Sequence, residues 1–179
     1  MFPGAPMTAL VHAGFKSAHA RTASTILSTV NQIIAERNAT NVICVGHSLG
    51  GALAILEGLY MRLNLPANIN VVTRTFGQPR IGNAALADFI DATLPDLARV
   101  TIKRDLVPTL PPLTTLYAHS KGEIHLNQDN VYEACSGHDN PSVNCSTGQV
   151  LAQGFELEDH VGPYPGGITL GTPDQGTLC

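Results

Sequence analysis

The sequence has few charged residues, no concentration of like charge and no long apolar segment. Charged residues make up 13% of the 179 residues and hydrophobic residues 44%, the reverse of a disordered composition. The net charge of −4, with no block of five like charges, argues against nucleic-acid binding as the main activity. The apolar runs at Val42–Val45 and Ala52–Leu56 are far shorter than the roughly 20 residues of a membrane span. We therefore expect a single folded domain over residues 1–179, with no nucleic-acid partner and no transmembrane span.

The N-terminus and the cysteines give opposite indications of compartment. Met1 is followed by Phe-Pro-Gly-Ala-Pro, which has neither the basic nor the apolar region of a secretory signal. Cys135 and Cys145 bracket a polar loop, and a bridge between them would contribute about 2–3 kcal/mol in the chain-entropy model. Cys44 lies in an apolar run and is predicted to be a buried free thiol, whereas Cys179, the last residue, has no obvious partner. A candidate disulfide and an unpaired terminal cysteine are typical of a secreted protein, yet no secretory signal is present. We therefore expect that the beginning of the chain is missing.

Apolar patterns predict helices and strands in alternation. The expected elements are a helix over 15–37, a strand over 41–45, a helix over 52–63, a strand over 69–76, a helix over 84–94 and a strand over 99–103. Asn83 is placed to cap the last of these helices. The alternation implies βαβ crossovers and a parallel sheet. Beyond Pro112 the pattern changes, and 116–119 with 123–126 are expected to form a hairpin around Lys121-Gly122.

Gly46-His-Ser-Leu-Gly50 has the form Gly-x-Ser-x-Gly and joins an apolar strand directly to a helix. This is the setting of a nucleophile elbow, in which a strained turn lifts the serine hydroxyl clear of the sheet. Side chains two residues before and after Ser48 are expected to collide with the neighbouring helix and strand, so Gly46 and Gly50 must both be small. The N-terminus of the following helix favours negative charge beside the serine. Ser48 is the candidate nucleophile, and the alternative is an ordinary glycine-rich strand–helix turn.

Asp105 and His160 are the candidate partners of Ser48, because the chain order in this type of site is Ser, then Asp or Glu, then His. Asp105 follows the last predicted strand, where side chains emerge at the carboxyl edge of a parallel sheet. It could instead be a surface aspartate paired with Lys103 or Arg104. His160 lies in a loop near the C-terminus that can fold back over the sheet, and the alternative is a surface-loop histidine.

Other histidines fit the site less well. His119 and His125 lie in the expected hairpin and could pair across it or bind a metal, but two imidazoles without a third acidic or thiolate ligand make a weak site. His138 lies in the presumed disulfide loop. His47 lies in the elbow itself, and its side chain is expected to point away from the serine.

The chain resembles the fungal class 3 lipases, a family that also includes feruloyl esterases. The resemblance lies in five motifs in the family's order: Val11-His-Ala-Gly-Phe15, Val45-Gly-His-Ser-Leu-Gly-Gly-Ala-Leu-Ala54, Phe76-Gly-Gln-Pro-Arg-Ile-Gly-Asn83, Arg104-Asp-Leu-Val-Pro108 and Asp159-His-Val-Gly-Pro-Tyr164. It implies an α/β-hydrolase type of fold, with a mostly parallel central sheet and helices on both faces. It also implies secretion and, often, a disulfide like Cys135–Cys145.

Family members begin well upstream of Val11. The upstream part carries an N-terminal helix, several strands, the lid helix and a Ser or Thr whose amide helps to form the oxyanion hole. The resemblance therefore implies that this chain lacks the N-terminal strands, the lid and the second oxyanion donor. In some relatives an N-terminal cysteine pairs with one near the C-terminus, which would account for Cys179.

These observations predict a serine carboxylic-ester hydrolase, first of all a triacylglycerol lipase that acts through an acyl-enzyme on Ser48. His160 would be the base, Asp105 would orient it, and the amide of Leu49 would be one oxyanion donor. The side chains expected to line an acyl groove are those of Val107, Pro108 and Leu110. The expected partner is a lipid or ester substrate at an oil–water interface, met by a secreted monomer without metal or cofactor.

Two alternatives stay open. One is an esterase of the same family that acts on feruloyl or other small esters. The other is a truncated, non-catalytic lipase fragment, because loss of one oxyanion donor typically costs 10²–10³ in rate and lost strands leave an unpaired sheet edge.

Overall fold

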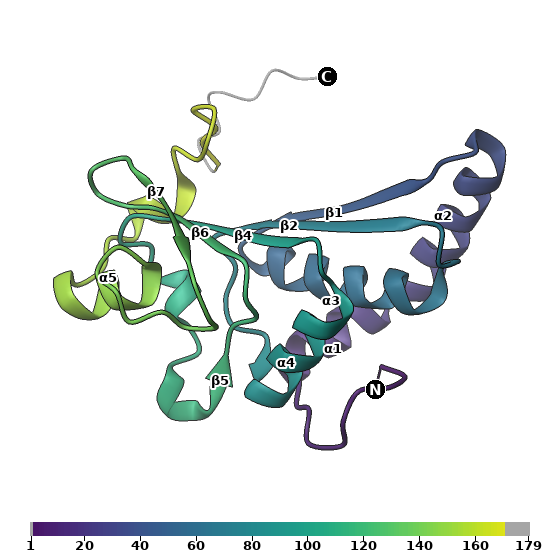
Figure 1. Cartoon of the computed structure of the whole chain (residues 1–179), viewed down its shortest axis with the longest axis horizontal. Coiled ribbons are helices and arrows are strands. Elements are labelled where there is room, and N and C mark those ends of the chain that lie inside the picture. The colour runs from purple at the N-terminus through teal and green to yellow at the C-terminus, as the bar shows by residue number, and fades with distance from the viewer. Residues whose placement is uncertain (1, 171–179) are drawn as a thin grey trace.

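A five-stranded sheet in the order β1-β2-β4-β6-β7 is the centre of the computed structural model, which describes residues 2–170 (Figure 1). The strands are β1 (Asn41–His47), β2 (Asn70–Phe76), β4 (Leu97–Ile102), β6 (Glu123–Leu126) and β7 (Tyr132–Cys135). The first four pair in parallel, and β7 pairs antiparallel with β6. The predicted mostly parallel sheet is therefore confirmed.

The remaining elements are helices, short 3-10 turns and a second, two-stranded sheet. The helices are α1 (Ala13–Ala20), α2 (Ala23–Arg37), α3 (Leu49–Asn64), α4 (Ala84–Thr93) and α5 (Ser146–Gln153). The 3-10 turns are η1 (Val107–Thr109), η2 (Leu113–Thr115) and η3 (Glu158–Val161), and the small sheet pairs β3 (Gly82–Asn83) with β5 (Tyr117–Ala118). Within residues 2–170 no helix is both long and apolar enough to cross a membrane.

The single helix predicted over 15–37 is wrong, because the chain leaves the helix between α1 and α2. Thr22 has φ −122° and ψ −22°, and its hydroxyl donates a hydrogen bond to the carbonyl of His19. Threonine hydroxyls compete in this way with the helical hydrogen bonds. At α4 the predicted cap is confirmed, since the side chain of Asn83 accepts the N–H of Leu86 at 3.1 Å.

The predicted hairpin of 116–119 with 123–126 is also wrong. β5 pairs with β3, whereas β6 joins the main sheet in parallel beside β4. Gly122 allows this course, because it has φ +88° and a side chain there would collide with the carbonyl of Leu97 at the start of β4. The hairpin in this part of the chain is formed instead by β6 and β7.

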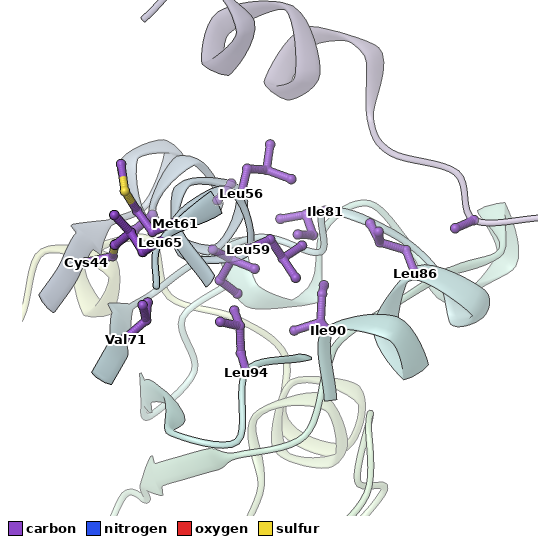
Figure 2. Close-up of a cluster of buried hydrophobic side chains, with 14 of the residues drawn as sticks. Cys44, Leu56, Leu59, Met61, Leu65, Val71, Ile81, Leu86, Ile90 and Leu94 are labelled. Atoms are coloured by element: carbon purple, nitrogen blue, oxygen red, sulfur yellow. The ribbon is translucent and has the colours of Figure 1, made fainter. Parts of the chain in front are cut away.

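An apolar core holds α3 against β1 and β2 (Figure 2). The core includes Ile55, Leu56, Leu59 and Met61 of α3, together with Val71, Ile81, Ile90 and Leu94. Gly58 packs directly against Thr73, where any side chain on the glycine would overlap the threonine hydroxyl. This close packing holds α3 directly against β2.

The helices gather on one face of the sheet. Figure 1 shows α1, α3 and α4 on one side, and the strand register turns Thr75, Glu123 and His125 to this same side. Gln149 of α5 contacts His125 there. The crossovers from β1 to β2 and from β2 to β4 proceed in the same direction along the sheet, and right-handed connections then place both helices on one face.

The opposite face is covered only in part. Tyr164 packs there against Val100 and Ile102 of β4, whereas Ile43 and Val45 of β1 are each 62% exposed. Helices were predicted on both faces of the sheet. Within residues 2–170, no helix covers this second face over β1.

The cysteines that the structure describes are arranged as predicted. A disulfide joins Cys135 to Cys145 and ties the end of β7 to the start of α5. Cys44 is a buried free thiol, and burial together with the nearby Glu57 raises its pKa to about 11. This thiol is therefore protonated and unreactive at neutral pH. Cys179 lies outside the described residues.

His119 and His125 are buried separately and do not pair with each other. His119 donates from Nε2 to the carbonyl oxygen of Pro108 at 2.7 Å. His125 contacts Thr101 Oγ1 at 2.8 Å and Gln149 Oε1 at 2.6 Å. Burial lowers the pKa of both histidines, and the positive charge of Arg99 lowers that of His119 further.

We expect the free energy of unfolding to fall as the pH drops from 7 to 5. His119 and His125 are neutral in the folded chain, whereas the unfolded chain binds protons at both below about pH 6.5. Their stabilising contribution is thus complete above pH 6.5 and decreases below it, by at most ~2.7 kcal/mol per pH unit for two protons. Urea unfolding at pH 7, 6 and 5 measures the slope, which should be smaller in His125→Gln. A free energy that does not change with pH would contradict the prediction.

Candidate active site

Ser48 lies at the sharp turn between β1 and α3. Its backbone has φ 54° and ψ −128°, a strained conformation for a residue other than glycine, and its N–H donates to the carbonyl of Phe76 at 2.9 Å. A side chain at Gly46 would collide with the backbone of Gly50, as predicted. The prediction for Gly50 itself is wrong, because a Cβ there meets no atom within 4 Å, whereas one at Gly51 would lie 2.8 Å from Gln78 Cβ.

We expect Gly50→Ala to raise the stability of the chain by about 0.5–1 kcal/mol, because alanine is the better residue in the helix and the added methyl group meets open space. Gly46→Ala is the matched comparison and should destabilise strongly, since its methyl group has no room. Thermal melting of the two variants beside the parent chain checks both effects. Destabilisation by Gly50→Ala equal to that of Gly46→Ala would contradict the steric argument.

Ser48, His160 and Asp105 form a continuous chain of hydrogen bonds. His160 Nε2 lies 2.8 Å from Ser48 Oγ, and His160 Nδ1 lies 2.9 Å from Asp105 Oδ2. Asp105 is 1% exposed, and its Oδ1 accepts the N–H of Val107 at 2.9 Å. The carboxylate of Asp105 therefore faces His160 and is not a surface partner of its basic neighbours.

Two side chains hold the backbone of His160, and the sequence did not reveal this role for either. The carbonyl of His160 accepts hydrogen bonds from His47 Nε2 at 2.8 Å and from the Tyr164 hydroxyl at 3.1 Å. The rings of His47 and His160 are also in contact, with 4.6 Å between centroids and a tilt of 34° between planes. Burial lowers the pKa of His47, which keeps it neutral near pH 7, and burial with the charge of Asp105 raises that of Tyr164. The one sequence feature that could have indicated this role for His47 is its position one residue before the serine.

Gly77 lies where the site is most crowded. It has φ +54°, and its N–H donates to the carbonyl of Val100 at 2.9 Å. A Cβ at this position would overlap the Tyr164 hydroxyl and lie 2.9 Å from Asp105 Oδ2 and 3.2 Å from His160 Cε1. The glycine therefore lets the end of β2 approach the Asp105 carboxylate and the His160 imidazole closely.

Arg80 supports the loop that follows Asp105. Its guanidinium is 1% exposed, donates to the carbonyls of Thr109 and Pro111, and forms an ion pair with Asp139 at 2.8 Å. The sequence identified the motif that contains Arg80 but not this role. Because two of its partners are backbone carbonyls, the main effect of the arginine is to fix the course of this loop.

The remaining predicted site residues lie around this centre. Leu49 begins α3, so its N–H is one of the first-turn donors that have no acceptor within the helix, and its side chain is 53% exposed. Leu110 is 38% exposed and Val107 is partly exposed, whereas Pro108 is buried. Their roles as oxyanion donor and acyl-groove residues stay predictions.

The sequence profile of the family "Lipase (class 3)" matches residues 2–115, more than half of the chain. The chain belongs to the class 3 lipase family. A secreted mono- and diacylglycerol lipase of Malassezia globosa is 31% identical to it over 158 residues, which are 88% of this chain and 51% of that lipase. A lipase of Rhizopus niveus is 36% identical over 113 residues, which are 62% and 29% of the two chains.

Solved lipase structures confirm the α/β-hydrolase fold. A Rhizomucor miehei lipase propeptide complex superposes with a TM-score of 0.79 at 28% identity, over 91% of this chain and 52% of that one. A triacylglycerol lipase whose catalytic centre is a serine protease triad superposes with a TM-score of 0.77 at 28% identity, over 90% and 61%. The chain thus spans about half the length, or less, of the curated lipases that it matches.

Proposed function

We propose that the protein is a secreted serine carboxylic-ester hydrolase that cleaves acylglycerols, and that residues 1–179 act as one domain. The observation that carries the proposal is the hydrogen-bond chain from Ser48 Oγ through the His160 imidazole to the buried Asp105 carboxylate. The names of the relatives, which include mono- and diacylglycerol lipases and a triacylglycerol lipase, support acylglycerols as the substrate class. Several of these relatives are named as secreted, and the disulfide suits that compartment.

In the proposed mechanism Ser48 Oγ attacks the acyl carbon while His160 Nε2 takes the hydroxyl proton. Asp105 accepts the Nδ1–H of His160, which leaves Nε2 free to act as the base, and stabilises the imidazolium that forms. The amide of Leu49 donates to the oxyanion of the tetrahedral intermediate. The imidazolium then gives its proton to the leaving glyceride alcohol. Water, activated by the same imidazole, releases the fatty acid from Ser48.

Exposed apolar side chains next to the triad support a lipid substrate. Leu49 directly follows Ser48 and is 53% exposed, and Val161 directly follows His160 and is 37% exposed. Leu110, at 38% exposed, comes from the loop after Asp105. We assign to Leu110, with Val107 and Pro108, the lining of the acyl groove, and the protein would meet its substrate as a monomer at an oil–water interface.

Fluorophosphonate labelling of the purified chain, read by intact mass, tests the proposal. We expect one adduct on the parent chain and none on Ser48→Ala, because only a serine activated by its histidine reacts at a useful rate. A cooperative thermal melt of both proteins shows that they are folded. No adduct on a folded parent chain would contradict the proposal and support the non-catalytic alternative.

Substrate profiling separates the acylglycerol lipase from the feruloyl esterase. Release of fatty acid from long-chain di- and triglyceride emulsions is expected to exceed hydrolysis of methyl ferulate at equal enzyme concentration. Faster hydrolysis of methyl ferulate than of the glycerides, in a chain that still labels at Ser48, would support the serine mechanism but contradict acylglycerols as the substrate class.

A further inference from the structure

A cluster of two carboxylates and one imidazole lies outside the triad. Asp88 and Asp91 are one turn apart on α4 and so share a side of the helix. His138 comes from the loop that the Cys135–Cys145 disulfide closes. Its Nε2 lies 2.7 Å from Asp91 Oδ2 and 3.7 Å from Asp88 Oδ1, and one ligand atom of each residue lies within 4.8 Å of the other two. We propose that these three residues bind a zinc ion that joins α4 to the disulfide loop.

The ligands are held in place without a metal. The N–H of Lys121 occupies Asp91 Oδ1 at 2.8 Å, which leaves Oδ2 directed at His138. The carbonyl of His138 accepts from the buried Arg99 guanidinium at 3.4 Å. The next residue, Asp139, is anchored by its ion pair with Arg80. A site arranged before the ion arrives loses little entropy when it binds.

The donor set favours zinc over calcium or magnesium. Zinc binds imidazole nitrogen and carboxylate oxygen at about 2.0–2.2 Å, whereas calcium and magnesium prefer oxygen ligands alone and more of them. Tetrahedral zinc separates its ligand atoms by about 3.3 Å. The distances of 2.7 and 3.7 Å from His138 Nε2 lie on either side of that value. Asp88 is 74% exposed at its side chain, so it can adjust to the ion.

Binding requires His138 Nε2 to give up the proton that faces Asp91. In the neutral imidazole this proton moves through solvent to Nδ1, and the Nε2 lone pair and two carboxylate oxygens then coordinate zinc, with water in the fourth position. No bond is oxidised or reduced. The Lys121 ammonium lies 3.9 Å from Asp91 Oδ2 and opposes the cation, but its side chain is 66% exposed and can turn away. The site is independent of the proposed ester hydrolysis.

Isothermal titration calorimetry of the full chain with zinc chloride, in a buffer without chelator, tests the proposal. We expect one site whose affinity falls by about tenfold or more in Asp88→Asn and in His138→Gln, since each loses a ligand. Asp129→Asn removes the same charge from an exposed aspartate and should leave the affinity unchanged. Lys121→Gln should tighten binding several-fold. Zinc should raise the melting temperature of the parent chain but not that of His138→Gln.

Cobalt serves as a spectroscopic substitute that reports where the metal binds. The d–d absorption bands of the cobalt-loaded parent chain should disappear in His138→Gln and persist in His160→Ala. Equal zinc affinity in the parent chain, Asp88→Asn and His138→Gln would overturn the proposal. Loss of binding in His160→Ala alone would also overturn it, because the ion would then lie at the triad. Millimolar magnesium or calcium that displaces zinc would contradict the nitrogen-containing site.

Discussion

Asp105→Asn is expected to lower the rate of fluorophosphonate labelling by about 10⁴-fold, through the wrong tautomer of His160. The side-chain oxygen of an asparagine would occupy the Oδ1 position, because the N–H of Val107 needs an acceptor there. Its amide NH₂ would then occupy the Oδ2 position, 2.9 Å from His160 Nδ1. The imidazole would have to accept at Nδ1 and carry its proton on Nε2, facing Ser48. Such a histidine cannot take the serine proton.

Labelling rates of parent and variant over pH 6–9 measure this effect. Asp129→Asn is the matched control, because it makes the same substitution at an exposed position and should label at the parent rate. The melting temperature of Asp105→Asn distinguishes a lost tautomer from a lost fold. A folded Asp105→Asn that labels within tenfold of the parent chain would show that Asp105 does not orient the base.

Gly77→Ala is expected to lower the labelling rate by about 10²-fold or more. The added methyl group would overlap the Tyr164 hydroxyl and press on Asp105 Oδ2, and misplacement of catalytic groups by about 1 Å can cost 10²-fold. The variant also puts a side chain on a residue at φ +54°, which adds roughly 1–2 kcal/mol of backbone strain. Its melting temperature should therefore fall together with its rate.

Gly137→Ala separates the two causes. Gly137 has φ +80°, but a Cβ there meets no atom within 4 Å, so the variant carries the backbone strain without the collision. It should lose stability and keep its labelling rate. The double variant Gly77→Ala/Tyr164→Phe, which removes the overlapped hydroxyl, should recover part of the rate lost in Gly77→Ala. Equal rates in Gly77→Ala and the parent chain would show that the site can accommodate a methyl group at this position without displacing Asp105 or His160.

Local pattern and topology rules were sufficient for the main features of this protein. The apolar run before Gly46 and the helical pattern after Gly50 predicted the elbow, because β and α periodicities are properties of neighbouring residues. The alternation of strands and helices predicted the parallel sheet. Asp105 and His160 were candidates because they follow Ser48 in the required order, and the structure brings the three within hydrogen-bond distance.

Contacts between distant segments were decided by the tertiary structure alone. Whether Gly50 needs to be small depends on what faces it across space, and nothing does among the described residues. The strand after Gly122 pairs with β4 and not with the preceding segment 116–119, because the backbone at that glycine passes against Leu97. The hydrogen bonds of His47 and Tyr164 to the carbonyl of His160 depend likewise on how the C-terminal segment lies over the sheet.

The cluster of Asp88, Asp91 and His138 illustrates the same division. The helical spacing of the two aspartates could be predicted from the sequence, since residues three apart share a helix face. Their meeting with a histidine 47 residues beyond Asp91 depends on the course of the disulfide loop, which no short-range periodicity encodes. Patterns of neighbouring residues specify secondary structure and the edge on which functional groups emerge. Which of those groups touch is settled by packing, because side-chain contact depends on strand order, register and loop course together.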